Sequence, residues 1–148
     1  MIAKTSACLL GILLCLLCGG LIQSAWAYNT EDLKRLKATG SCPRCDLSAA
    51  TLDELQLFRS NLSGANLSGA NLSRTNLIAA DLSRADLSGA ILSGANLSGA
   101  DLSSANLSTA ELLETELTLV DFSGAKLERA SLENANLLKA KLPNADLS

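Results

Sequence analysis

A five-residue register runs through most of this chain and restricts its fold more than any other feature. Counting in steps of five from Leu47 to Leu147 gives 21 positions, of which 20 are leucine and one is Phe122. Two residues before each position, the residue is usually alanine. The exceptions are Cys45, Leu55, Ser60, Thr75, Thr115 and Val120. The repeat therefore pairs one large apolar residue with one small one, and we expect both to face the interior.

A period of five fits neither a straight helix nor a straight strand. On an α-helix, each step of five advances by about 140° and spreads the leucines around the whole surface. On a strand, an odd step sends alternate leucines to opposite faces. All the leucines can be buried together only if the chain turns after each pentapeptide and winds into a coil. Backbone groups then pair with the coils above and below, so the sequence predicts an all-β solenoid.

The repeated phrases ANLSG, ADLSR, ADLSG and ADLSS resemble the A(D/N)LXX repeat of the pentapeptide repeat proteins, over residues 46–148. The resemblance implies a right-handed quadrilateral β-helix with four pentapeptides per coil, and hence about five coils. The stacking of residues 20 apart gives one check, from the sequence itself, of a coil with four sides. If positions 20 residues apart stack, Glu54 lies under Arg74 and the outward apolar residues Phe58 and Ile78 share a column.

Residues 1–27 are predicted to be a secretory signal peptide. Lys4 precedes an apolar stretch over residues 7–22, and Ala25-Trp26-Ala27 matches an A-x-A cleavage site. The alternative is a retained membrane anchor. However, this stretch is interrupted by glycines and is shorter than the ~20 residues that a spanning helix needs. We therefore expect export with cleavage, and no stable membrane insertion afterwards.

Composition argues against an enzyme and against a nucleic-acid partner. The chain contains no histidine, which removes the commonest general base and metal ligand. The serines belong to the repeat, and no glycine-rich phosphate loop interrupts it. The net charge is only −3, so no strong field favours a charged polymer. We predict no enzymatic activity, no cofactor and no metal.

Residues 28–45 are predicted to form an N-terminal capping helix followed by a CxxC segment. Asn29 or Thr30 can cap a short helix that ends at Gly40, with Leu33 and Leu36 on one side. A helix of about ten residues is marginal on its own. Its leucines are therefore expected to dock on the open first coil.

Cys42 and Cys45 are the two cysteines that remain after removal of the signal peptide. Haem attachment would need a histidine where Asp46 stands, a four-ligand zinc site lacks two ligands, and the βαβ context of a thioredoxin-like motif is missing. Because Cys45 occupies an inward alanine site, we interpret the pair as a disulfide that staples the capping helix to the first coil. Closing so short a loop contributes only ~2 kcal/mol in the chain-entropy model. Reduced structural thiols and redox chemistry are the alternatives.

Outward apolar residues mark a candidate binding surface. Under a 20-residue coil, Phe58, Ile78 and Leu138 share one column where the repeat would otherwise place serine. Leu113 and Leu119 are expected elsewhere on the later coils. Single exposed apolar groups are common, so packing without a partner is the alternative interpretation.

The final residues, KLPNADLS, are still in register. Leu142 and Leu147 fall at inward positions, and a solenoid end exposes its core and an unpaired backbone edge unless it is covered. We expect either end-to-end homodimerisation through this coil or an edge blunted by Lys139, Lys141 and Pro143.

A column of carboxylates invites comparison with the phosphates of DNA. Asp81, Asp101 and Asp121 stack under the 20-residue register, and Lys141 follows them. At one charge per ~4.8 Å the column is far sparser than duplex DNA, which carries one per ~1.7 Å. We interpret it as a solvated ladder.

The capping helix followed by CPRCDLSAATL resembles the start of exported pentapeptide repeat proteins of cyanobacteria, which implies a periplasmic or thylakoid-lumen location. The predicted function is a protein-binding or scaffold rod whose partner is unknown. The alternative is an autonomous structural protein that stabilises the envelope. Protection of DNA gyrase by DNA mimicry, the best-known activity of the family, is disfavoured because those proteins are cytoplasmic and strongly acidic along the rod.

Overall fold

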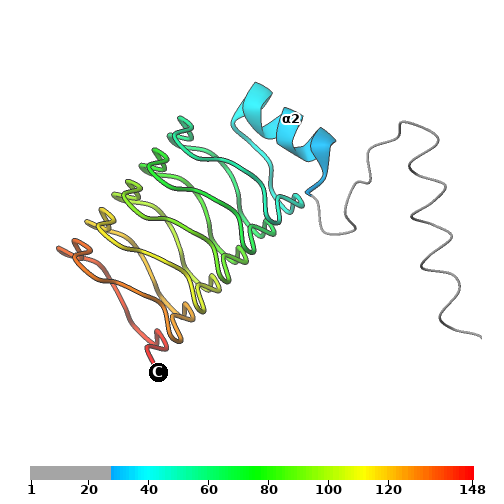
Figure 1. Ribbon diagram of the computed structural model, residues 1–148. Helices are drawn as coiled ribbons and strands as arrows, with labels where there is room; N and C mark the ends of the chain where they lie inside the picture. Colours follow the sequence, from blue (N-terminus) through cyan, green and yellow to red (C-terminus); the bar gives the residue numbers. More distant parts are fainter. Residues whose placement is uncertain (1–27) are drawn as a thin grey trace, which may run out of the picture.

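The fold is a stack of coils closed at one end by a helix. The computed structural model describes residues 28–148, and the predicted signal peptide lies outside this range. Figure 1 shows helix α2 (Thr30–Thr39) lying across one end of the stack, with the C-terminus at the opposite end. The capping helix predicted from the sequence is therefore present at the predicted place.

Neighbouring coils pair through single-residue parallel bridges between positions 20 residues apart, from Ser41 with Asn61 to Lys126 with Asp146. In one such pair, the Leu62 N–H donates to the Asp81 carbonyl oxygen (2.8 Å), and the Asp81 N–H donates to the Ser60 carbonyl oxygen (2.9 Å). Each coil thus takes four pentapeptides, as the family resemblance implies.

Pairing begins at Ser41, so the first coil already contains the CxxC segment that we had grouped with the capping helix. The reason is the register itself. Cys42 occupies the central position of a pentapeptide, one step of five before Leu47, and its N–H donates to the Asn61 carbonyl oxygen (2.7 Å).

Each pentapeptide ends in a tight turn that forms one corner of the coil. In the repeat that follows Asn61, the Ala65 N–H donates to the Leu62 carbonyl oxygen (3.0 Å), and Gly64 has φ +64°. A positive φ at the third residue of such a turn is the signature of type II geometry. This position explains the glycine that recurs at the end of the repeat.

The repeated asparagine or aspartate holds the next corner in place. The Asn61 Oδ1 accepts the Ser63 backbone N–H (3.1 Å) and the Ser63 hydroxyl (2.8 Å). The same pair of bonds recurs at Asn66, Asn71 and Asn96. Both residue types supply the same acceptor oxygen, which accounts for their interchange in the repeat.

The interior follows the predicted pattern. The central leucines from Leu47 to Leu127 and the alanines two residues before them are buried, together with Phe122. Two inward threonines are accommodated because their hydroxyls donate to backbone carbonyls, Thr75 to Leu52 (2.9 Å) and Thr115 to Leu92 (3.2 Å). In the final coil the central leucines become partly exposed.

Helix α2 begins and ends where its sequence signals predict. The Asn29 side chain caps it by accepting the N–H groups of Glu31 (2.9 Å) and Asp32 (3.3 Å). Gly40 ends it in the left-handed conformation, at φ 66°, and donates its N–H to the Leu36 carbonyl oxygen (2.8 Å). Leu36 is buried, and Leu33 packs more loosely against the core.

Candidate functional site: the junction of α2 and the first coil

Cys42 and Cys45 meet inside the first corner of the coil. Their sulfur atoms lie 2.02 Å apart, at the distance of a disulfide bond, and their Cα atoms lie 5.4 Å apart. Both side chains are buried. The pair takes the places of the usual inward leucine and alanine, so the bond spans a corner of the first coil. The prediction that this bond staples the helix to the coil is wrong. Cys42 is already part of the paired coil, so both ends of the bond lie in the coil.

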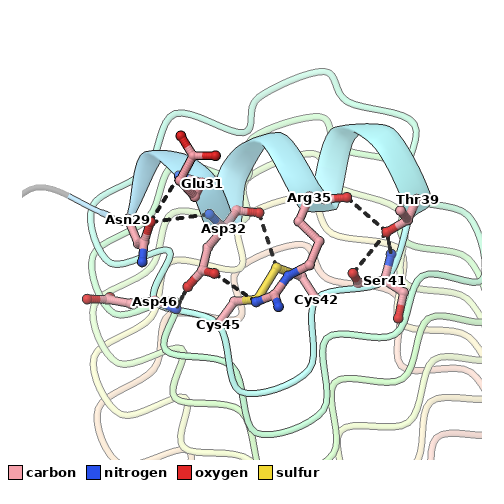
Figure 2. Close-up of polar contacts among 9 residues, drawn as sticks. All are labelled: Asn29, Glu31, Asp32, Arg35, Thr39, Ser41, Cys42, Cys45 and Asp46. Atoms are coloured by element: carbon pink, nitrogen blue, oxygen red, sulfur yellow. Dashed lines mark hydrogen bonds and ion pairs between the residues drawn. A yellow bond between two sulfur atoms is a disulfide. The ribbon is translucent and has the colours of Figure 1, made fainter.

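Helix α2 covers this cystine with two polar side chains. Figure 2 shows Arg35 reaching from α2 to the sulfur of Cys45, with 2.7 Å between Nη2 and Sγ. The same nitrogen donates to the Asp32 Oδ1 (2.7 Å), and the Asp32 Oδ2 accepts the Asp46 backbone N–H (2.9 Å). Through these contacts, the helix is tied to the corner that holds the cystine. Sequence reasoning missed the part played by Asp32 and Arg35, although their i, i+3 spacing on one helix indicated that they could pair.

The junction also gathers groups that could in principle hold a metal ion. One ligand atom from each of Asp32, Cys42 and Cys45 lies within 4.8 Å of the others. Cysteine binds metals as a thiolate, so a cystine is a poor ligand. The Arg35 guanidinium, moreover, contacts both the Asp32 carboxylate and the Cys45 sulfur. The junction in this form favours the arginine cation over a metal ion.

Phe58, Ile78 and Leu138 lie in one column, as the register predicts, but the column is interrupted by Ser98 and Thr118. The side chains of Phe58 and Leu138 are 51% and 61% exposed, whereas Ile78 is half-buried. The Arg59 guanidinium lies over the Phe58 ring, 4.9 Å from its centroid. Whether this surface binds a partner stays a prediction.

Leu119 adds to this surface, which corrects our expectation that it lies elsewhere. Its N–H donates to the Leu138 carbonyl oxygen (3.0 Å), so the two residues are neighbours on adjacent coils, and Leu119 is 57% exposed. One corner of the rod thus carries an apolar pair near each end. We call Phe58, Ile78, Leu119 and Leu138 the apolar corner.

The carboxylate column is also formed as predicted, because Asp81, Asp101 and Asp121 are bridged in sequence and Lys141 follows. The hydroxyl and N–H of Ser123 donate to Asp121 and lower the pKa of its carboxyl group. Burial opposes this effect, and Lys141, with its Nζ 3.8 Å from the Asp121 Oδ2, adds to it.

At the other end of the rod, Leu142 is partly exposed and Leu147 is 60% exposed. Their role as a dimer end stays a prediction. Within residues 28–148, no helix is long and apolar enough to cross a membrane.

Comparison with known proteins agrees with this architecture. The family model for pentapeptide repeats matches residues 42–77, 56–94, 80–118 and 115–148. The chain therefore belongs to the pentapeptide repeat family, as its repeated phrases predict. No curated protein matches the sequence.

Solved structures of the same class resemble the rod. Rfr23, a pentapeptide repeat protein from the cyanobacterium Cyanothece 51142, is 26% identical, with a TM-score of 0.62 over 80% of this chain and 99% of that one. A pentapeptide repeat protein from Nostoc Pcc 7120 is 32% identical, with a TM-score of 0.62 over 81% of this chain and 99% of that one. Likeness to these structures supports the β-helical fold of the family.

Proposed function

We propose that this protein is a non-enzymatic, exported rod that binds a protein partner through the apolar corner. The observation that carries the proposal is the placement of Phe58, Ile78, Leu119 and Leu138 on one corner. The repeat normally places serine or glycine at these positions, and the fold does not need large side chains there. Exposed apolar groups gathered along one edge are typical of interaction sites.

The neighbouring surface indicates the chemistry of the partner. The column that follows the apolar corner along the chain carries Asp81 and Asp101, and then Asp121, whose carboxylate lies 3.8 Å from the Lys141 Nζ. A partner segment that sets apolar side chains on the corner would meet these carboxylates at its flank. We therefore expect it to carry basic residues beside its apolar ones, because opposite charges favour the correct register.

Export to the periplasm or to the thylakoid lumen is part of the proposal. The pattern of residues 1–27 and the pairing of Cys42 with Cys45 at one corner support it, since disulfides persist in oxidising compartments. Intact mass of the native protein tests this part. A mass that includes residues 1–27 would contradict it.

The binding proposal is tested by cross-linking and pull-down from the exported compartment with three variants. We expect Phe58→Ser with Ile78→Ser, and separately Leu119→Ser with Leu138→Ser, to lose a partner that the unchanged protein captures. Leu113→Ser is the matched control, because Leu113 is 37% exposed and belongs to another corner. All three variants should keep nearly unchanged thermal unfolding. If binding and stability fall together, the corner serves packing, and if no capture depends on the corner, the autonomous structural role is favoured.

A further inference from the structure

The cystine at the junction is closed off from solvent by elements on both sides. Cys42 and Cys45 are 0% and 1% exposed. On the inner side, Leu62 and Ala65 of the next coil occupy the stacked positions and are themselves fully buried. On the outer side lies α2, whose Arg35 contacts Cys45 and whose Asp32 carbonyl oxygen lies 3.2 Å from the Cys42 sulfur. Both sulfurs are thus covered by the next coil on one side and by α2 on the other, and α2 is the cover that is not part of the stacked coils.

The remaining packing of α2 is limited. Leu36 is its one buried side chain, and Leu33 packs against the core while partly exposed. The carbonyl oxygen of Gly40, which ends the helix, accepts the Asn61 N–H (3.1 Å). Beyond the sulfur contacts, the Asp46 backbone joins it by accepting the Asn29 N–H (3.0 Å) and by donating to the Asp32 carboxylate (2.9 Å). A cleft of about 340 Å³ is lined by Leu36 and Lys37 of α2 and by Leu55 and Leu57 of the first coil. A ten-residue helix with so little packing is sensitive to small changes beneath it.

We propose that Cys42–Cys45 is a redox-modification site for a dithiol reductant, and that its state sets how firmly α2 covers the first coil. Reduction breaks the S–S bond, and the two sulfurs must then separate to van der Waals contact. The buried coil below leaves them no room, because protein interiors are close-packed. The displacement is directed against α2, which loosens. The proposal does not depend on binding at the apolar corner.

The position of Arg35 assigns the two cysteines different roles. Its guanidinium lies against Cys45 and stabilises negative charge on that sulfur. The better leaving group in thiol–disulfide exchange is the sulfur that carries negative charge more easily. One thiolate of the reductant attacks Cys42 to form a mixed disulfide, and Cys45 leaves as a thiolate. The second thiol of the reductant then displaces Cys42, so the pair gains two electrons and two protons while the reductant becomes a disulfide.

The test measures amide hydrogen exchange of residues 30–39 with and without dithiothreitol, on protein whose thiol state is verified by alkylation. We expect exchange in α2 to be about tenfold faster after reduction, with the coils over residues 61–127 unchanged. The matched control is Cys42→Leu with Cys45→Ala, which restores the repeat phrase and should not respond to the reagent. Unchanged exchange in fully reduced protein, or equal acceleration throughout the coils, would overturn the proposal.

A second measurement tests whether α2 guards the cystine. Leu36→Ala removes the buried anchor of α2 and should speed the reduction of the cystine by dithiothreitol several-fold, because α2 then opens more often and exposes the two sulfurs. Ala38, an exposed residue of the same helix, offers the control, and Ala38→Ser should leave the rate unchanged. Equal rates for the unchanged protein and Leu36→Ala would show that α2 does not guard the sulfurs.

Discussion

At the scale of single residues, the polar side chains of the repeat stabilise the corners of the coil through hydrogen bonds to the backbone. The repeated asparagine or aspartate supplies one oxygen to the backbone of the serine two residues later, as at Asp101 with Ser103 (2.8 Å) and Asn106 with Ser108 (3.2 Å). The spare groups of these side chains then link coils, as when the Asn106 Nδ2 donates to the Asp86 Oδ1 (3.0 Å). The amide and the carboxylate thus serve the corner equally but differ in their response to pH.

Asp121 allows this difference to be measured. Its folded pKa is lowered, chiefly by the Ser123 hydroxyl, so its contribution to stability is present above the unfolded value of ~3.9 and is lost as pH falls through the folded pKa. Asp121→Asn keeps the acceptor oxygen but does not titrate. We therefore expect the loss of thermal stability between pH 7 and pH 3 to be smaller in Asp121→Asn than in the unchanged protein. An equal loss in both would show that Asp121 does not contribute to acid sensitivity.

The structural element of this fold is the pentapeptide. Its corner contains a residue with positive φ, and backbone strain is expected there when that residue is not glycine. Glycine occupies the left-handed position at Gly64, Gly94 and Gly99 among others, whereas Ala79, Arg84 and Leu119 adopt the same conformation with a side chain. A left-handed conformation costs a non-glycine residue ~1–2 kcal/mol. Each of these residues donates its N–H to the next coil, as Ala79 does to the Ser98 carbonyl oxygen (3.0 Å), and this bond helps to keep it in place.

Two substitutions in one column isolate this cost. Gly99→Ala should destabilise the protein by ~1 kcal/mol, because φ is +68° and an added Cβ meets nothing within 4 Å. Ala79→Gly, at φ 55° on the neighbouring coil, should stabilise it by about 0.5 to 1 kcal/mol, since the relieved strain exceeds the added freedom of the unfolded chain. Denaturant unfolding measures both. Shifts of the same sign would refute strain as the cause.

At the scale of the whole molecule, the five-residue register predicts a coil with its leucines inward, and the capping residues predict the ends of α2. The 20-residue stacking is predicted by the family resemblance, because a period of five alone does not choose four sides over three. The junction could be predicted only in part. The spacing of Arg35 and Cys45 in the sequence does not predict that the helix lies across the first corner, because tertiary packing sets the orientation of the helix relative to the coil. For the same reason, Leu119 was separated from Leu138, since they neighbour each other only across a corner.

Coils that contact only their neighbours should still fail together when one is broken at its centre. Leu97 is fully buried in the middle of the stack. Leu97→Asp buries an unpaired carboxylate and leaves its coil unable to support the coils on either side, so we expect a loss of at least ~4 kcal/mol and cooperative unfolding. Leu97→Met preserves volume and should cost under ~1.5 kcal/mol. Circular dichroism gives the stability, and hydrogen exchange shows whether residues 61–81 and 107–127 lose protection together. Protection retained on one side of Leu97→Asp would mean that the rod folds in independent sections.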